Sequence, residues 1–222
     1  ENTKWGIRSL YKQGVLHLST VNFLGYDKDE NGKLVINERE AGIVKRVFYE
    51  FLEGSSPGDI ARKLTAEEVP GVKGSTSWYS STIYHMLRNE KYMGDALCQK
   101  YYVADYLTGK QVLNKGEIEQ VYIKKNHEPI VPVHIWKAVQ QELDRGVAYR
   151  KKHGLYVTNH LSDKNPFAAR VFCGKCGQPY TQRTWYRDKK PVKVWQCRSR
   201  YAVKGAMGCG NVNLHKEKLL RF

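Results

Sequence analysis

The sequence predicts an α+β fold in two parts: a helical, helix-turn-helix-like domain that opens with a β-hairpin, then a mixed α/β domain built around cysteines. Three observations predict it. Three short segments between residues 38 and 89 carry apolar residues at helical spacing. Asn31-Gly32 stands between apolar flanks, a typical hairpin turn because both residues tolerate positive φ. Four of the five cysteines lie from Cys173 onward.

Composition indicates a polyanionic partner. The 222 residues include 37 Lys and Arg against 22 Asp and Glu, a formal net charge of +15. Solubility alone calls for a net charge of roughly 2–8, so ordinary solubilising charge is the weaker explanation. No apolar run approaches the ~20 residues of a membrane span, and no secretory signal opens the chain. We therefore expect a nucleic acid as the partner, and no membrane.

Residues 1–14 look helical and basic, as the end of a longer helix.

A stretch shortly after this segment could instead be a calcium site. Residues 27–38 match the loop pattern of a calcium-binding EF-hand, with Asp27, Asp29 and Glu38 among the ligand positions. An EF-hand also needs a helix entering the loop, and the preceding residues favour extended chain. A hairpin followed by a helix start is therefore the preferred interpretation.

Capping residues delimit three helices. Asn37 begins a helix that Gly54 ends, and Ser56-Pro57 begins the second. Ser80 or Ser81 is expected to cap a third, which runs to Asn89. Three short helices with a tight second-to-third connection predict a helix-turn-helix variant.

The third helix has two distinct faces. At 100° per residue, Ile83 and Leu87 lie together, whereas Ser81, His85 and Arg88 point the opposite way, flanked by Tyr84 and Asn89. An outward row of short polar and basic side chains suits phosphates and base edges. A plain solvated face is the alternative.

Residues 99–128 read as a β-rich connector. Alternating apolar residues there favour a β-hairpin or an extended ribbon. A further helix is expected from about Val133, with Ile135, Val139 and Leu143 on one face.

The cysteines predict one structural zinc site. Cys173 and Cys176 have the C-x-x-C spacing of a tight metal-binding turn, and Cys197 and Cys209 would complete a tetrahedral set. Thiolate-only ligation favours zinc in a closed site. His215 is the alternative to Cys209 as fourth ligand, and two disulfides are a less favoured arrangement. Cys98 stands alone and is expected to be a small buried hydrophobe.

The segment between the cysteine pairs has the strand–turn–strand pattern of a zinc ribbon, with the turn at residues 188–191. Its cations lie among aromatic residues, which suits phosphate contact, although a solvated surface competes. The ribbon residues expected to contact DNA are Arg183, Arg187, Lys193, Arg198 and Arg200.

These motifs, in this order, carry a resemblance to a known family. The stretches "GYDKDENGKLVINEREAGIVKRVFYEFLEGSSPGDIARKL", "STIYHMLRNEKYMGDALCQK", "HEPIVPVHIWKAVQQEL" and "FCGKCG" resemble the C-terminal part of large serine recombinases. These are the serine integrases and transposases of phages and of conjugative or mobilisable elements. The resemblance covers nearly the whole chain.

The resemblance implies a domain arrangement. Residues 1–14 would end a linker helix from an N-terminal catalytic domain, and residues 15–98 would form the recombinase domain. Residues 99–128 would connect it to a zinc-ribbon domain, residues 129–222, that lacks the family's coiled-coil insertion. The catalytic serine belongs to the missing domain, so this chain alone should be inactive.

The resemblance also implies a function: sequence-specific binding of double-stranded DNA that positions the enzyme on attachment or transposon-end sites. Helix 81–89 would enter the major groove beside loop 71–79. The family further implies a bacterial, cytoplasmic protein that acts as a dimer or tetramer on DNA. A zinc-ribbon transcription regulator or RNA-binding module is the alternative. The resemblance adds these expected DNA contacts: Lys73, Ser75, Trp78, Tyr79, Ser80, Thr82 and Lys91.

Overall fold

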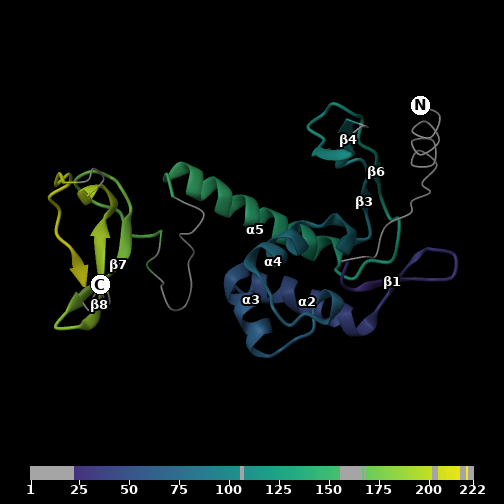
Figure 1. The fold of residues 1–222 in the computed structure, drawn as a ribbon, viewed down its shortest axis with the longest axis horizontal. Coiled ribbons are helices and arrows are strands. Elements are labelled where there is room, and N and C mark those ends of the chain that lie inside the picture. The colour runs from purple at the N-terminus through teal and green to yellow at the C-terminus, as the bar shows by residue number, and fades with distance from the viewer. Residues whose placement is uncertain are drawn as a thin grey trace. The chain divides into compact units, whose positions relative to one another are not determined.

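The structure is a computed structural model that describes residues 23–105, 108–155, 167, 169–201, 205–215 and 219 (Figure 1). The chain divides into two compact units, one up to Glu142 and one from Leu143 onward, and each is described by itself. No helix in the described ranges has the length and apolar character needed to cross a bilayer. The helix predicted over residues 1–14 lies outside the described residues.

The first unit opens with the predicted hairpin. Strand β1 (Tyr26–Lys28) pairs antiparallel with β2 (Leu34–Ile36), and Gly32 takes the positive φ of 75° that the turn needs. The Asp29 carboxylate accepts the backbone N–H groups of Asn31 and Lys33 at 2.9 and 2.8 Å. Asp27 accepts from the Asn37 side chain at 2.9 Å. These carboxylates therefore serve the turn and the helix start, as the hairpin interpretation expects.

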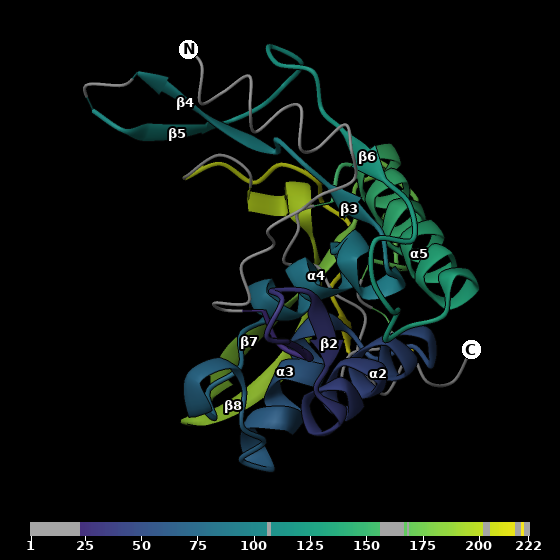
Figure 2. The same ribbon diagram turned by 90° about the vertical axis from the view of Figure 1, so that its right-hand side faces the viewer.

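Three helices follow and pack together: α2 (Glu38–Leu52), α3 (Pro57–Ala66) and α4 (Ser80–Arg88) (Figure 2). Asn37 caps α2 by accepting from the Glu40 N–H at 3.2 Å, and Ser56 caps α3 in the same way through Asp59. Both caps were predicted. The cap predicted for α4 is wrong, because Tyr79 occupies the N-cap position and makes no side-chain cap bond.

The core of this unit lies between the helices. Phe48 of α2, Ile60 and Leu64 of α3, and Ile83 and Leu87 of α4 are each fully buried. Burial of large apolar side chains contributes roughly 1.5–3 kcal/mol each, so this packing fixes α4 with its apolar face inward. The predicted inner face of α4 is confirmed.

Short strands follow α4 and the 3₁₀ turn η2 (Glu90–Met93). Strand β3 (Ala96–Leu97) pairs antiparallel with β6 (Tyr122–Ile123), and β4 (Tyr101–Asp105) pairs antiparallel with β5 (Lys110–Leu113). Of the two alternatives predicted for this stretch, a β-hairpin or an extended ribbon, the β4–β5 pair is a hairpin. Glu90, only 6% exposed, accepts from the Leu97 N–H at 3.0 Å and from Lys100 Nζ at 2.6 Å, which ties η2 to the strands.

Helix α5 (Val133–Lys152) begins where the sequence predicts. Its first turns pack in the first unit, where Val131 and Val139 are fully buried and Trp136 donates to the Asn89 carbonyl at 3.0 Å. The division between the two compact units falls at Leu143, within α5. The domain boundary expected at residue 129 stays a prediction. Contacts with α4 draw the start of α5 into the helical unit.

The second unit contains a three-stranded antiparallel sheet in the order β7 (Tyr180–Arg187), β8 (Lys190–Cys197) and β9 (Leu214–His215). Asp188 and Lys189 form the β7–β8 turn with φ of 51° and 62°, inside the predicted turn region. A small buried cluster of Cys173, Tyr180, Trp195 and Cys197 lies at the base of the ribbon. Helices together with small antiparallel sheets make the fold α+β, as predicted.

Candidate metal centre and nucleic-acid interface

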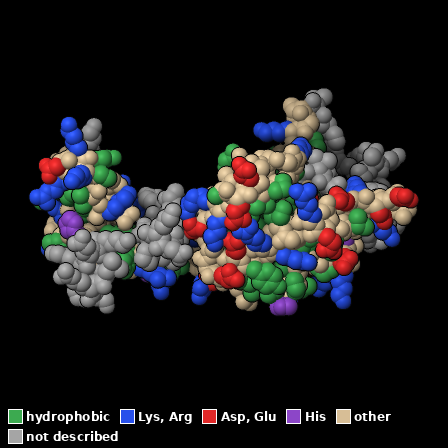
Figure 3. All heavy atoms as spheres, turned by 90° about the horizontal axis from the view of Figure 1, so that it is seen from below, with side chains coloured by type: hydrophobic (Ala, Val, Ile, Leu, Met, Phe, Trp, Pro, Cys, Tyr) green, Lys and Arg blue, Asp and Glu red, His purple; other side chains and the backbone are tan. Residues whose placement is uncertain are grey.

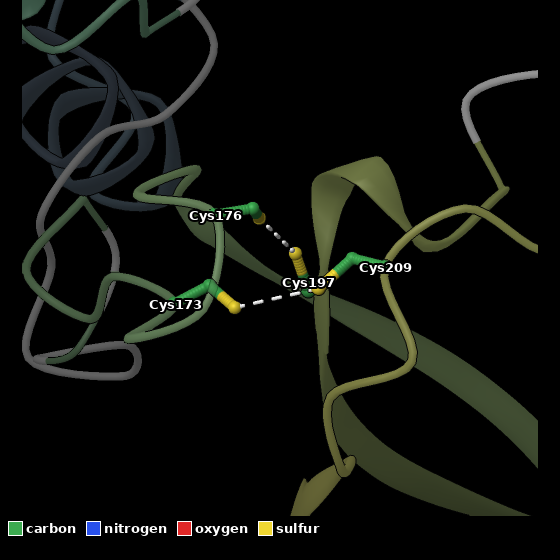
Figure 4. A group of neighbouring side chains, drawn as sticks. All are labelled: Cys173, Cys176, Cys197 and Cys209. Carbon is green, nitrogen blue, oxygen red and sulfur yellow. Dashed lines mark hydrogen bonds between the residues drawn. The ribbon is translucent and has the colours of Figure 1, made fainter.

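Four cysteines from three segments converge in the second unit (Figure 4). The Sγ atoms of Cys173, Cys176, Cys197 and Cys209 all lie within 4.8 Å of one another. The Cys173–Cys209 and Cys176–Cys197 pairs are 3.6 and 3.4 Å apart. A disulfide requires about 2.05 Å, so none is formed.

Tight backbone turns bring the sulfurs together. The Gly177 N–H donates to the Cys173 carbonyl at 2.8 Å, and Gly177 has a φ of 68°, so the C-x-x-C loop folds back on itself. The Cys209 N–H donates to the Ser199 carbonyl at 3.2 Å, and Gly208 lies so close to that carbonyl that a Cβ would collide with it. The long gap between Cys197 and Cys209 is therefore closed by the turn around η3 (Arg198–Tyr201).

This donor set fits zinc. Thiolates about 2.3 Å from one tetrahedral zinc lie about 3.8 Å from each other, close to the sulfur separations observed. Four thiolates leave no open position, so the site suits a structural ion. Among the described residues, no other group of three or more His, Cys, Asp or Glu side chains could hold a metal.

The surroundings prepare one sulfur for metal. Burial raises the pKa of Cys173, but hydrogen bonds from the Asn211 side chain, 3.1 Å away, and from the backbone N–H groups of Cys176 and Lys175 outweigh it and lower the pKa to about 6. Thiolates are the ligand form, so these hydrogen bonds favour the form of Cys173 that binds metal. Burial raises the pKa of Cys197 to about 12.

The geometry also bears on the choice between His215 and Cys209 as fourth ligand and on the role of Cys98. His215 lies in β9, exposed and paired with Val194, and it is not part of the cysteine group. Cys209 is therefore the fourth member. Cys98 is buried in the first unit, 5% exposed, as predicted for a small hydrophobe.

The predicted DNA contacts of the ribbon fall into two groups. Arg183, Arg187 and Lys193 are exposed on the outer half of β7–β8, and Lys193 Nζ donates to Thr184 at 2.8 Å across the strands. Arg198 and Arg200 are half-buried and donate to the carbonyls of Gly154 and Asn211. These last two therefore brace the unit.

The ribbon surface is strongly basic. Residues 169–201 contain nine Lys and Arg against one acidic residue, Asp188. On the face drawn in Figure 3, Lys and Arg predominate in this unit, whereas they are interspersed with Asp and Glu in the helical unit. A positive ribbon of this kind suits phosphate groups.

The predicted contacts around α4 divide in the same way. The side chains that are exposed, and so accessible to a ligand, are Lys73, Ser75, Tyr79, Ser80, Ser81, Thr82 and His85. Tyr84, Arg88, Asn89 and Lys91 are half-buried. Lys73 has a positive φ of 59°, a backbone conformation that a compact turn imposes.

Two predicted contacts have structural roles. Trp78 is only 9% exposed, and its Nε1 donates to the Val69 carbonyl at 2.9 Å. Lys91 lies beside Glu90, with Nζ 5.9 Å from the Phe23 ring centre, and burial lowers its pKa. Both side chains anchor the segments that flank α4.

Sequence reasoning missed two residues. Asn211, which donates to Cys173 Sγ, follows Cys209 by two positions, and that proximity was the only local signal. Gln140 of α5 donates from Nε2 to the Leu87 carbonyl at 2.7 Å and accepts from Arg88 at 3.1 Å. No pattern in the sequence pairs these positions.

The comparisons with known proteins agree with these two units. Residues 38–146 match the Recombinase family, and residues 166–222 match the Recombinase zinc beta ribbon domain. The chain belongs to the recombinase family. The predicted resemblance to the C-terminal part of large serine recombinases is thereby confirmed.

Individual relatives share less than a third of their residues with this chain. A Bacillus subtilis (strain 168) protein named as a DNA recombinase is 29% identical over 231 residues, covering 100% of the chain and 44% of that protein. The chain thus spans less than half of that relative's length.

Two solved structures share the fold. A crystal structure of an LSR–DNA complex matches with a TM-score of 0.58 at 20% identity, over 100% of this chain and 61% of that one. A structure from work on the sequence requirements of the Listeria innocua prophage attP site matches with a TM-score of 0.56 at 23% identity, over 100% and 84%.

Proposed function

We propose that this chain is the DNA-binding region of a large serine recombinase and that it binds a specific double-stranded site. The observation that carries the proposal is the presence, in one chain, of an exposed polar helix face and a separate, strongly basic zinc ribbon. Helix α4 would read bases in the major groove as the recognition helix of a helix-turn-helix variant, and the ribbon would hold an adjacent stretch of duplex.

The reading helix is supported by its burial pattern. Ile83 and Leu87 are fully buried, so Ser81, Thr82 and His85 are fixed on the outside by the packing of α4 against α3. Short side chains on a rigid helix suit hydrogen bonding to base edges, because little conformational freedom is lost on contact.

The ribbon is supported by charge and shape. Arg183, Arg187 and Lys190 are exposed on the outer half of β7–β8, away from the buried cluster at its base. Cations on such a ribbon bind phosphates irrespective of sequence, and the affinity falls with added salt. One structural zinc on the four cysteines would keep this small unit folded.

The wider role follows from the family. In the full-length protein, this chain would bind attachment or transposon-end DNA and so place the catalytic domain on that DNA. Dimers or tetramers on that DNA in the bacterial cytoplasm are part of the same proposal. Linking two modules raises overall affinity through effective concentration, which suits a long site.

Selection from a randomised duplex library tests the proposal. The zinc-loaded chain should enrich one sequence and bind it on the order of 10³-fold or more tighter than a scrambled duplex at physiological salt. The logarithm of the affinity for both duplexes should fall linearly with log salt. An unenriched library, or equal affinities for the two duplexes, would refute sequence-specific binding.

An RNA-binding module is the second candidate, because the ribbon unit exposes aromatic rings. Trp185 is 44% exposed, Tyr186 76% and Tyr201 61%, and such rings can stack on unpaired bases. Competition decides between the two. Single-stranded RNA that displaces the selected duplex at equal concentration would favour RNA, whereas the recombinase proposal predicts that excess RNA competes only through charge.

A further inference from the structure

Helix α5 holds the C-terminal end of the proposed reading helix. Gln140 Nε2 donates to the Leu87 carbonyl at 2.7 Å, and Trp136 Nε1 donates to the Asn89 carbonyl at 3.0 Å. The last carbonyl groups of a helix have no partner within that helix. Two side chains one turn apart on α5 therefore satisfy the end of α4 across about fifty positions of sequence.

Gln140 also holds a side chain. Its Oε1 accepts from Arg88 at 3.1 Å, while Arg88 Nε donates to the Tyr84 hydroxyl at 3.4 Å. The guanidinium carbon lies 5.7 Å from the centre of the Tyr84 ring, within the range of a cation–π contact. Arg88 is therefore held on one side by α4 itself and on the other by α5.

Arg88 lies where a contact with Gln140 can affect ligand binding by α4. One turn before it, His85 is exposed on the outer face of α4, and Arg88 is half-buried at the edge of the same face. An unrestrained arginine loses rotamer freedom when it binds. A guanidinium already fixed in one orientation loses less, and it accepts only ligands placed to suit that orientation.

We propose that Gln140 is a positioning residue that fixes Arg88, and that this contact sets how well α4 discriminates one DNA sequence from another. Arg88 is the group that touches DNA, and Gln140 acts through it. The neighbouring Gln141 has the same side chain but is exposed on the same helix, so it provides a matched control.

The inference rests on the proposed DNA-binding function, and a double-mutant cycle tests it separately. The zinc-loaded chain and the variants Gln140→Ala, Arg88→Ala and their combination are titrated against the duplex selected by the wild type and its scrambled counterpart. Gln140→Ala should lower the ratio of specific to scrambled affinity by roughly three- to tenfold, since one side chain is no longer pre-ordered. The double variant should lose no more than Arg88→Ala alone.

Two further variants separate positioning from stability. Gln141→Ala removes a matched side chain from the same helix and should leave the ratio unchanged. Trp136→Phe removes the donor to the Asn89 carbonyl and makes the ring smaller, so it should lower the melting temperature while the ratio stays as in wild type. Thermal unfolding checks that each variant folds.

Each outcome has a distinct meaning. A wild-type chain that binds both duplexes equally refutes the proposed function itself. If the wild type discriminates but Gln140→Ala retains the full ratio, the positioning role is refuted. The positioning role is also refuted if the losses of this ratio in Gln140→Ala and Arg88→Ala add up in the double variant. It is refuted as well if Gln140→Ala lowers the affinities for the selected and the scrambled duplex equally. If Gln140→Ala unfolds, Arg88→Lys replaces it: loss of discrimination supports the fixed guanidinium, and a wild-type ratio contradicts it.

Discussion

The two units are stabilised by different means. The largest fully buried side chains of the helical unit include Tyr26, Phe48, Ile60, Leu64 and Leu87. In the second unit, Trp195 and Val194, each 1% exposed, are the described apolar residues buried to that extent. A unit with so small an apolar cluster gains little from burial, and a structural metal is one of the ways in which small domains are stabilised instead. The four cysteines therefore suit a structural metal site.

The units also differ in the surface they offer. The helical unit fixes a few short polar side chains on a rigid face, and the ribbon unit exposes many cations on two strands. The first arrangement suits discrimination and the second suits affinity. The following experiments are ordered from the largest expected effect to the smallest, and each tests whether this division holds.

Loss of zinc should unfold one unit only. Cys173→Ser, or a chelator, removes a contribution on the order of 10–16 kcal/mol from the second unit, while the helical unit keeps its core. Hydrogen exchange should show protection lost in residues 169–201 and kept in α2, α3 and α4. Cys98→Ser is the matched control and should retain one zinc per chain. A folded metal-free ribbon would contradict the account.

Truncation of a core side chain should destabilise the helical unit and leave the zinc-binding unit folded. Leu64→Ala removes a fully buried side chain and should lower the free energy of unfolding of the helical unit by about 2–5 kcal/mol. Leu52→Ala, at a position 37% exposed, should change it by about 0.5 kcal/mol or less. Zinc content should stay at one per chain in both. Zinc loss in Leu64→Ala would mean that the two units fold together.

Glu90 should make the helical unit sensitive to acid. Burial raises the pKa of its carboxyl, but the hydrogen bonds from Lys100 and Leu97 outweigh burial and lower it. Its stabilising contribution is therefore present above the unfolded carboxyl pKa of about 4.3 and lost as pH falls through the lower folded value. Glu90→Gln should destabilise by about 1–3 kcal/mol at pH 7.

Unfolding curves across pH check this. The difference between wild type and Glu90→Gln should shrink as the pH is lowered below about 4, because the wild-type carboxylate is then protonated as well. The exposed Glu119→Gln is the control, and it should track the wild type. A difference that does not depend on pH would place the effect in packing.

Substitutions on the two surfaces should leave stability nearly unchanged. Those on α4 should mainly reduce specific binding, and those on the ribbon should reduce specific and non-specific binding alike. His85→Ala should weaken binding to the selected duplex by about 1–3 kcal/mol and to a scrambled duplex much less. Arg187→Ala should weaken both equally and reduce the slope of log affinity against log salt by about 1. Lys45→Ala, which removes an exposed cation outside both surfaces, should do neither. If His85→Ala weakened both duplexes equally and Arg187→Ala weakened only the selected duplex, the ribbon would discriminate between sequences and α4 would supply general affinity.

Local chemistry made much of this structure predictable. Asn37 and Ser56 have side chains that cap helices, and both do. Cys173 and Cys176 have metal-ligand spacing, and their sulfurs lie in one group with Cys197 and Cys209. In each case the residue type and its near neighbours determine the outcome, so the sequence alone was sufficient.

Contacts between distant segments were not predictable in this way. Trp78 lies in a loop but is buried, because its indole donates to a carbonyl nine positions earlier. The sequence also showed no sign of the bonds from Trp136 and Gln140 of α5 to the end of α4. Ser80 failed as a cap because Tyr79 sits at that position. Tertiary hydrogen bonds of this kind leave no periodic signal along the chain.

Hydroxyl-radical footprinting tests the central claim most directly. The zinc-loaded chain on its selected duplex should protect two neighbouring stretches, one for α4 and one for the ribbon. Removing zinc with a chelator should abolish protection of one stretch and weaken but retain the other. A single protected stretch that is indifferent to chelation would contradict the division of DNA binding between the two units.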